Sequence, residues 1–593
     1  MLYITAEDPI SGVVVKLAGS VSIDEKTGQL TSEFNNAPPL PFSELKLHLF
    51  EGEDSGSTQA TPPRCGTYKS EATFLASTGA ELKAEPEFTI NSGPSDEGGA
   101  CPTGPTLPFA PGFKAGAANT QAGAFSAFSV VLERADGNQP LKTIAVHEPA
   151  GLAAELASVT PCPSAIAQSA NPSCPASSQV GESTAYAGDG SKPVAIGGKV
   201  YLTGPVKGAP FGLLSVTEAE HVGPFNLGNI PVLSTITVDP ETAAATITSD
   251  PVPEFAPKPG DPAHSTGVPS QIKKLVVNVN REGFTFNPTN CGKKNIVGVF
   301  SGWEGGVSSS NAPFQATNCE SLPFKPTIEA SIEKDVSRSL GTGLKITVKS
   351  GAGQANILGT KLEFPATIPS RITTLQKSCR DTVFNVNPAS CSPESIVGTG
   401  TAHTPVLKAP LTGPIYLVSH GNAAFPDAEF VLQGEGIKLI LDGKTDIEKV
   451  NGKSVTISTF ETVPDAPVES FEVSLPRGTK SAFSGFGDLC TEKPVMPTLF
   501  TGQNGATVKS TTKINVTGCP PPKGGVLHSR NADELAKNLK TCKKLANKKK
   551  RAKCVASAHK RFSAVNACLK VKKGKKRTGC EVKARKKNPL KKS

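Results

Sequence analysis

A short motif occurs three times in this chain and restricts its architecture more than any other feature. Each copy has Asn-Pro, then a cysteine, then Val-Gly with the glycine seven residues past the cysteine: NPSCPASSQVG ending at Gly181, NPTNCGKKNIVG ending at Gly298 and NPASCSPESIVG ending at Gly398. An internal repeat on this scale is typical of a string of related modules rather than of one enzyme fold.

The motif belongs to a longer repeat. Cys162 and Cys174 have the same spacing as Cys379 and Cys391, and the two copies stand about 217 residues apart. Alternating apolar residues precede each pair, and a Tyr-Leu step follows it. A module type therefore returns after roughly two hundred residues.

A second segment type has polar turn residues between two alternating runs. Its copies are SIDEKTGQLTSEF from Ser22, TVDPETAAATITS from Thr237 and DIEKVNGKSVTIS from Asp446. This pattern predicts a β-hairpin. Two cysteines follow each copy, so we expect two alternating module types and about five modules.

Composition predicts the fold class. Short alternating runs of Val, Ile, Thr and Phe are separated by 57 glycines and 51 prolines, which is typical of many short strands joined by turns. Nothing alternates strand with helix, which argues against a parallel α/β sheet. We expect an all-β fold of tandem β-sandwich modules of two alternating types, with a short basic α-helical C-terminal tail. The expected parts are sandwich modules at residues 1–119, 120–235, 236–335, 336–425 and 426–520, and a basic helical or disordered tail at residues 521–593.

The first module is expected to be truncated. GVVVKLAG from Gly12 matches GIKLILDG from Gly436, which places Met1 inside a module. We expect an upstream part to be missing, because a domain rarely leaves half of a sheet uncovered; a shortened first module is the alternative. The sequence has no run of 18 apolar residues and no signal peptide at its start, and a signal could precede the missing part.

The 14 cysteines can be grouped into seven pairs of successive cysteines along the chain. No C-x-x-C occurs and the eight histidines are scattered, which argues against zinc clusters. We expect seven local disulfides and an extracellular or cell-surface location, with reduced structural cysteines as the alternative. The expected pairs are Cys65 with Cys101, Cys162 with Cys174, Cys291 with Cys319, Cys379 with Cys391, Cys490 with Cys519, Cys542 with Cys554, and Cys568 with Cys580.

The tail differs from the rest of the chain in charge. Residues 521–593 hold 25 Lys and Arg against 3 Asp and Glu, a net charge of +22, whereas the whole chain carries +10. Asn531 with Glu534 resembles a helix start, and a helical hairpin with lysines at its turn would let Cys542 meet Cys554. A straight helix would hold those two cysteines about 18 Å apart, too far for a disulfide.

The lysines and arginines of the tail predict binding to a polyanion: an anionic cell-envelope polymer, an acidic polysaccharide, phospholipid headgroups or nucleic acid. Nucleic acid is the weaker of these, because the tail has one aromatic residue, Phe562. A solvated tail that aids solubility is the alternative. The candidate residues are Lys543, Lys544, Lys548, Lys549, Lys550, Arg551, Lys572, Lys573, Lys575, Lys576 and Arg577.

No motif predicts catalysis, a metal or a cofactor. The segments 52–57 and 442–445 resemble a protease serine loop and a phosphate loop, but each lacks a required glycine, so we interpret both as hairpin turns. Paired carboxylates recur at Asp24, Asp239 and Asp446, and we interpret them as turn caps. One Trp and five Tyr are few for sugar platforms.

The run CPASSQVG, GGKVYLTGP, GAPFGLLSV, DPETA, FTFNPTNC and APFQATNCESLPFKP resembles the repeat of very large secreted β-sandwich proteins of high-GC Gram-positive bacteria. The resemblance covers residues 1–519, and the cysteine-containing tail resembles the ends of other secreted proteins of such bacteria. It implies a surface or extracellular protein and supplies no catalytic residues.

We therefore expect a non-enzymatic, adhesin-like structural protein whose cationic tail associates with an anionic envelope polymer or polysaccharide. The alternative is the accessory C-terminal region of a secreted polysaccharide-active enzyme whose catalytic domain lies upstream. A cytosolic nucleic-acid binder is a third interpretation, which reduced cysteines would favour. The oligomeric state is open.

Overall fold

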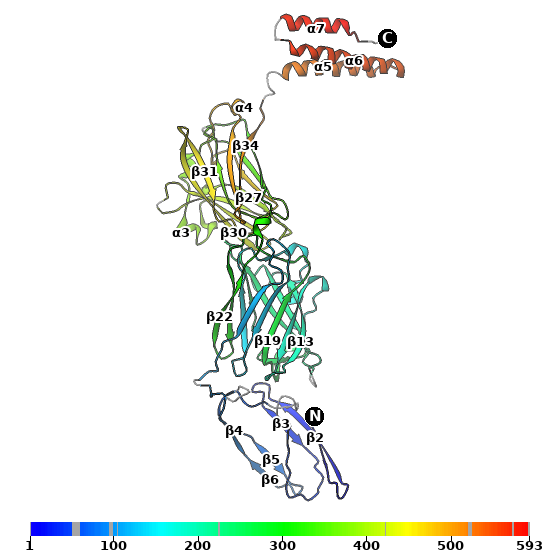
Figure 1. Ribbon diagram of the computed structural model, residues 1–593, viewed down its shortest axis with the longest axis vertical. Coiled ribbons are helices and arrows are strands. Elements are labelled where there is room, and N and C mark those ends of the chain that lie inside the picture. Colours follow the sequence, from blue (N-terminus) through cyan, green and yellow to red (C-terminus); the bar gives the residue numbers. More distant parts are fainter. Residues whose placement is uncertain are drawn as a thin grey trace. The chain divides into compact units, whose positions relative to one another are not determined.

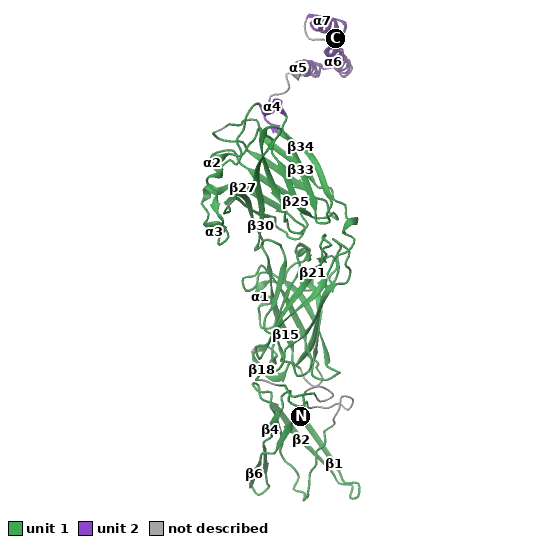
Figure 2. Ribbon diagram, turned by 60° about the vertical axis from the view of Figure 1, so that its left-hand side comes forward, with its two compact units in different colours: residues 1–487, 493–515 green, residues 488–492, 516–593 purple. Residues whose placement is uncertain are grey.

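The computed structural model describes residues 2–49, 60–93, 99–102, 105–222, 226–337, 339–421, 423–519, 525–571 and 575–590 (Figure 1). The chain divides into two compact units, residues 1–487 with 493–515 and residues 488–492 with 516–593 (Figure 2). The first unit is built from strands and the second mainly from helices. This confirms the expected fold class, tandem β-sandwiches with a helical tail.

Three small antiparallel sheets form the N-terminal part, in the orders β1-β2-β3, β4-β7 and β5-β6. Their strands are β1 (Leu2–Glu7), β2 (Val14–Ile23), β3 (Leu30–Phe34), β4 (Gly66–Lys69), β5 (Ala72–Leu75), β6 (Glu81–Ala84) and β7 (Glu87–Ile90). Ile10, Phe42 and Leu75 are 95 %, 75 % and 75 % exposed, so this part buries little apolar surface.

The first large sheet has eleven strands in the order β22-β21-β10-β16-β15-β14-β13-β12-β19-β9-β8, and β8 also lies against β22. Its strands are β8 (Gly112–Ala117), β9 (Phe128–Glu133), β10 (Leu141–His147), β12 (Gln179–Ala187), β13 (Val194–Thr203), β14 (Phe211–Glu218), β15 (Asn229–Val238), β16 (Ala245–Ser249), β19 (Ile272–Val279), β21 (Lys294–Gly302) and β22 (Val307–Phe314). The shorter elements around it are β11 (Ala153–Ala154), η1 (Leu156–Ser158), α1 (Ser164–Ala167), η2 (Ala176–Ser178), β17 (Phe255–Lys258), β18 (Asp261–Pro269), β20 (Thr285–Phe286) and η3 (Cys319–Ser321). We call residues 106–325 the first sandwich.

The second large sheet has the order β26-β28-β27-β32-β24-β23-β34-β33-β25-β31-β30-β29, and β28 pairs with β29 as well, so the sheet closes on itself. Its strands are β23 (Thr327–Glu333), β24 (Leu344–Lys349), β25 (Ile357–Glu363), β26 (Cys379–Arg380), β27 (Ile396–His403), β28 (Leu411–Ser419), β29 (Asp427–Gly434), β30 (Ile437–Val450), β31 (Lys453–Phe460), β32 (Ser470–Leu475), β33 (Val495–Gly502) and β34 (Thr507–Thr517). Short helices α2 (Ile372–Leu375), α3 (Asp381–Phe384), η4 (Pro388–Ser390) and η5 (Pro393–Ser395) lie in the loops, and α4 (Leu489–Glu492) belongs to the second unit. We call residues 326–487 and 493–515 the second sandwich.

The two sandwiches repeat one topology. When β8 is matched with β23, β9 with β24, β10 with β25, β12 with β27 and so on along the chain, eleven strands follow the same neighbour order in both sheets. The matched strands also share a pattern, because β21 and β33 both bury every second residue. That alternation is what a strand with one face in a core requires. The long repeat in the sequence therefore corresponds to one whole sandwich.

The six-part division of the chain stays a prediction, but strand pairing bears on four of its boundaries, of which two serve as examples. The position between residues 235 and 236 lies inside β15, and the position between residues 425 and 426 separates β28 from β29, which pair. Neighbouring module types thus contribute strands to a shared sheet. The physical reason is that a few strands cannot cover their own apolar face, so each half of the repeat completes the other.

The three predicted hairpins form, as β2–β3, β15–β16 and β30–β31. Asp24 and Asp239 cap the first two turns: each carboxylate accepts from two backbone amides and from a hydroxyl, that of Thr27 or of Thr242. These bonds, led by the one from the threonine hydroxyl, lower the pKa of both aspartates. The expectation for Asp446 is wrong, because this residue lies in the middle of β30 and the turn comes later, at residues 451–452.

All seven predicted disulfides are present, each between neighbouring cysteines, and free cysteines are absent from the described residues. Cys162–Cys174 and Cys379–Cys391 close matching loops before β12 and before β27. Cys291–Cys319 and Cys490–Cys519 join the segments that flank the hairpins β21–β22 and β33–β34 in the sequence. Cys379–Cys391 therefore repeats the loop closure of the first sandwich, and Cys490–Cys519 occupies the matching place in the sequence.

Asp465 joins the two sandwiches. Its carboxylate is 5 % exposed and accepts four hydrogen bonds: from the amide and hydroxyl of Thr289 at 2.9 and 2.6 Å, from the Asn290 amide at 3.0 Å and from Asn356 Nδ2 at 2.8 Å. Gly151 has φ 94° beside it, where an added Cβ would lie 2.7 Å from Asp465 Oδ2. Thr289 and Asn290 belong to the second copy of the Asn-Pro motif, so this copy forms the junction.

Replacing Asp465 with alanine should uncouple the two sandwiches. The change leaves two buried and two half-buried donors without their acceptor, which costs about 3 kcal/mol. Calorimetry of the full chain should then show the unfolding of the sandwiches as two separated transitions, with the lower one shifted down. The control variant Asp261→Ala changes an exposed aspartate and should unfold with the same calorimetric profile as the wild type. A D465A profile identical to that of the wild type would contradict the proposed junction.

The loop disulfide of the first sandwich should contribute measurably to stability. The double variant Cys162→Ser, Cys174→Ser removes the disulfide that closes a loop between cysteines 12 residues apart. It should lower the free energy of unfolding by about 3 kcal/mol. Denaturant unfolding measures this loss. Peptide mapping without reduction should recover the other six neighbour pairs, and scrambled pairs in the wild-type protein would contradict the assignment.

Candidate functional site

The predicted polyanion site lies in a bundle of helices α5 (Gly525–Lys543), α6 (Lys548–Ala567), η6 (Cys568–Lys570) and α7 (Lys575–Lys587). Helices α5 and α6 form the predicted hairpin, and Cys542 bonds Cys554 across it. Asn531, expected as a helix start, lies within α5 and donates to Asn566 Oδ1 at 3.0 Å. Apolar side chains packed around the cysteine pair are Leu535, Leu539, Leu545, Val555, Ala558 and Leu590.

The tail contains its own repeat, which the sequence analysis missed. CKKLANKKKRAKC and CLKVKKGKKRTGC share a Lys-Lys-Arg step three residues before the second cysteine, and both close as disulfides. Arg551 donates to the carbonyls of Leu545 and Ala546, and Arg577 donates to those of Val571 and Leu569. The arginine of each copy therefore binds its own loop. The equal cysteine spacings were the signal that could have revealed this repeat.

The lysine candidates that the structure describes are available to bind external anions. Lys543, Lys544, Lys548, Lys549, Lys550, Lys575 and Lys576 are all exposed. The described part of the chain shows no ion pair for any of these seven. Lys572 and Lys573 lie outside the described residues. Two of the three acidic residues of the tail are already paired, because Glu534 binds Arg561 and Arg585, and Glu581 binds Arg585.

Two features concentrate positive potential at the turn between α5 and α6. Lys548, Lys549, Lys550 and Arg551 open α6, and Asn547 caps the helix by accepting from the amides of Lys549 and Lys550 at 2.9 and 3.2 Å. A helix N-terminus already carries partial positive charge, so cations there are unfavourable for folding. The arrangement is suited to an anion with several charges.

A group of titratable side chains surrounds His420 in the second sandwich. Its Nε2 lies 3.5 Å from Glu429 Oε1 and 3.7 Å from Asp427 Oδ2, and its Nδ1 lies 3.8 Å from Asp381 Oδ2. Burial raises the pKa of Glu429 to about 8, with further increases from the neighbouring charges of Asp442, Asp427 and Glu241. In the part of the chain that the structure describes, no set of three or more His, Cys, Asp or Glu side chains is placed to hold a metal ion.

The other motif segments do not assemble a site. Residues 442–445 were expected to form a turn, and this is wrong: they continue β30 where it changes partner, from Ala428 opposite Gly443 to Thr459 opposite Lys444. Gly443 is required there because an added Cβ would lie 2.5 Å from the Phe460 ring. Residues 52–57 lie outside the described residues. Trp303 donates a hydrogen bond from Nε1 to the Val252 carbonyl, and Lys142 Nζ lies over its ring in a cation–π contact.

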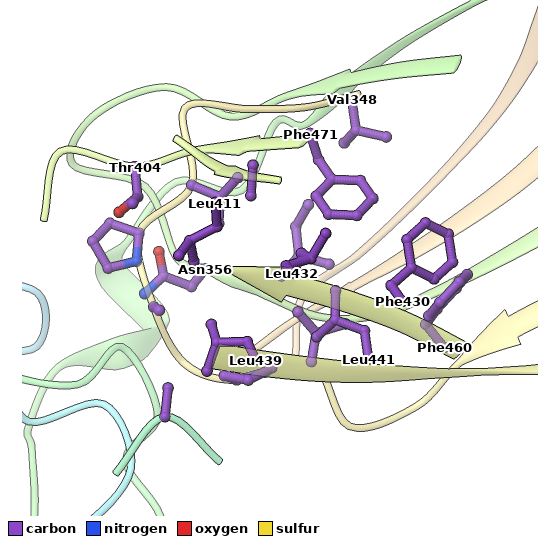
Figure 3. Close-up of a pocket in the computed structure, with 18 of the residues that line it drawn as sticks. Val348, Asn356, Thr404, Leu411, Phe430, Leu432, Leu439, Leu441, Phe460 and Phe471 are labelled. Atoms are coloured by element: carbon purple, nitrogen blue, oxygen red, sulfur yellow. The ribbon is translucent and has the colours of Figure 1, made fainter. Parts of the chain in front are cut away.

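The interior of the first unit contains an apolar cavity of about 360 Å³. Its walls come from both sandwiches, with Phe128, Leu213 and Phe284 from the first and Leu411, Phe430 and Phe471 from the second. Figure 3 shows the part in the second sandwich, where Phe430 and Phe460 lie at one end and Asn356 and Thr404 at the other. The cavity therefore continues across the junction that Asp465 holds.

Comparisons with known proteins assign this chain to no family. No family model matches the chain, and no curated protein matches it. Among solved structures, it is similar to the type II cohesin dyad of the adaptor ScaA scaffoldin of Acetivibrio cellulolyticus at 11 % identity, over 69 % of this chain and 99 % of that one, with a TM-score of 0.15. A membrane-anchored protein of Corynebacterium diphtheriae matches at 12 % identity, over 78 % and 99 %, with a TM-score of 0.14.

TM-scores of this size carry no argument about fold or function. The resemblance to secreted repeats of high-GC Gram-positive bacteria therefore stays a prediction. Within the described residues, no helix combines the length and apolar character that crossing a bilayer requires.

The stability of the protein should fall as the pH rises towards 8. Glu429 has a pKa of about 8 in the folded state against an ordinary value of 4.5. Its contribution to the free energy of unfolding is therefore fully present below about pH 4.5 and lost by about pH 8. The loss should amount to a few kcal/mol. Urea unfolding between pH 5 and 9 measures it.

Glu429→Gln supplies the control for that dependence. The variant should flatten the fall in stability between pH 5 and 9, because the amide does not titrate. Part of the slope should remain, since burial also raises the pKa of Glu148 to about 8. An unchanged slope in E429Q would show that Glu429 is ionised at neutral pH in the folded protein.

Proposed function

We propose that this protein is a non-enzymatic structural or adhesive component outside the cell, and that its cationic tail associates with an anionic envelope polymer. The observation that carries the proposal is the combination of seven neighbour disulfides with a disulfide-closed bundle whose described lysines face solvent. Disulfides of this number persist in oxidising compartments. They support an extracellular or surface location.

The two sandwiches support a mechanical role. They repeat one topology, and Asp465 with its four donors joins them at a buried junction. Modules that contact mainly their neighbours extend a protein without adding chemistry. The described residues that sequence analysis considered for catalysis cap turns, continue strands or pack in the core.

The tail supplies the attachment. Its exposed lysines lie on disulfide-linked helices and the turn between α5 and α6, where several charges stand close together. An anionic polymer with repeated charges can bind several of them at once, and it releases small counterions in doing so. Such binding weakens with salt, because the Debye length falls to about 8 Å at physiological ionic strength.

Neutralising four of the tail lysines should weaken wall binding. In full-length protein, the combined change of Lys549, Lys550, Lys575 and Lys576 to glutamine should weaken binding to purified Gram-positive cell walls at least about tenfold at low salt. Co-sedimentation with the walls measures this. Wild-type binding should also fall steeply as salt is raised to physiological strength.

Two controls make this test specific. Changing four exposed lysines of the sandwiches to glutamine (Lys293, Lys345, Lys509 and Lys513) removes the same charge and should leave binding near the wild-type level. Cell walls stripped of their anionic polymers should not retain the wild-type protein. Equal binding of both quadruple variants would reject the tail as the attachment site.

A further inference from the structure

We propose that the cavity shared by the two sandwiches binds a single-chain lipid with an uncharged head, such as a long-chain alcohol, and that Glu148 contacts that head. This activity is separate from the attachment assigned to the tail. The argument rests on the size of the cavity, on the chemistry of its walls and on the position of one carboxyl group.

The cavity has the dimensions and walls of a ligand site. About 360 Å³ falls within the roughly 300–1,000 Å³ usual for small-molecule pockets. Protein interiors are otherwise close-packed, and an unfilled apolar void loses the dispersion contacts of its lining. Apolar cavities of this kind stay dry and accept apolar guests. A flexible hydrocarbon chain would restore those contacts.

The apolar region is continuous over two sandwiches. Val279 and Phe284 of the first belong to one core cluster with Phe430 and Leu432 of the second, and the cavity runs through this cluster. Backbone bonds cross the junction beside it, for example from the Ala157 amide to the Val406 carbonyl at 2.9 Å. A hydrocarbon chain could contact apolar side chains of both sandwiches at once.

Glu148 is the ionisable group that a ligand would meet. It follows β10 directly and is the one titratable side chain among the residues that line the cavity. Its backbone amide donates to the Ala245 carbonyl, but its carboxyl group has no hydrogen bond or ion pair among the described residues. Ligand pockets typically combine apolar walls with a few polar groups that fix the orientation of the ligand, and the unpaired carboxyl group of Glu148 can supply such a hydrogen bond.

The same residue selects the head of the ligand. Burial raises the pKa of Glu148 to about 8, so at neutral pH the group is mainly a neutral acid that can donate to a hydroxyl oxygen and accept from its proton. The cavity lining contains no lysine, arginine or histidine that could neutralise an anion. An anionic head would be disfavoured, increasingly so above pH 8, where Glu148 ionises.

Displacement of an uncharged fluorescent probe, N-phenyl-1-naphthylamine, from the full-length protein tests the proposal. The probe should bind saturably at one site per chain, and 1-dodecanol should displace it. Dodecanoate should compete at least about tenfold more weakly than dodecanol at pH 9, because two negative charges would be buried together. No saturable probe binding, or dodecanoate equal to dodecanol, would overturn it.

Three variants locate the site. Ala428→Phe adds a ring to the cavity wall and should reduce probe binding at least about tenfold, whereas Gln433→Phe, exposed on the same strand, should leave it unchanged. Glu148→Gln should keep dodecanol binding and narrow the gap to dodecanoate at pH 9. If A428F folds poorly, E148Q alone decides, since an unchanged gap removes Glu148 from the site.

Discussion

Pairing between strands that are distant in the sequence holds each sandwich together. Leu344 of β24 pairs with Leu475 of β32. In the first sandwich, β10 pairs with β21, although most of the sandwich lies between these two strands in the sequence. Bringing such strands together requires the loss of loop entropy before any contact forms, which makes folds of this kind slow to assemble. The neighbour disulfides shorten the loops that remain, and they stand at matching places in the sequence of both repeats.

The junction between the sandwiches is polar at Asp465 and apolar in its interior. A buried carboxylate with four donors specifies one arrangement, because a displaced partner would leave several groups without hydrogen bonds. Beside it, Val279 and Phe284 join the apolar cluster of the second sandwich. The same junction thus couples two repeats mechanically and encloses the space in which we propose that a lipid binds.

Charge is divided between the parts of the chain in a way that the net value hides. Residues 521–593 carry +22 while the whole chain carries +10. Inside the tail, arginines such as Arg561 and Arg585 pair with Glu534, and Arg551 and Arg577 bind loop carbonyls. The planar guanidinium group suits these fixed hydrogen bonds, whereas flexible lysines suit contact with an external polymer.

Local patterns in the sequence determined the local structure: alternation specified the strands, the Asp-x-x-Thr turns specified two hairpins, and the spacing of the cysteines specified seven disulfides. Each of these depends on residues that are close in the chain. The tertiary structure alone decided that Asp446 lies within a strand, because β30 continues past Gly443 to a new partner. It also decided that the two module types share one sheet, that Asp465 meets the second Asn-Pro motif, and that Glu148 faces a cavity. These arrangements depend on which distant surfaces cover one another, and that choice is made by packing, which no local pattern encodes.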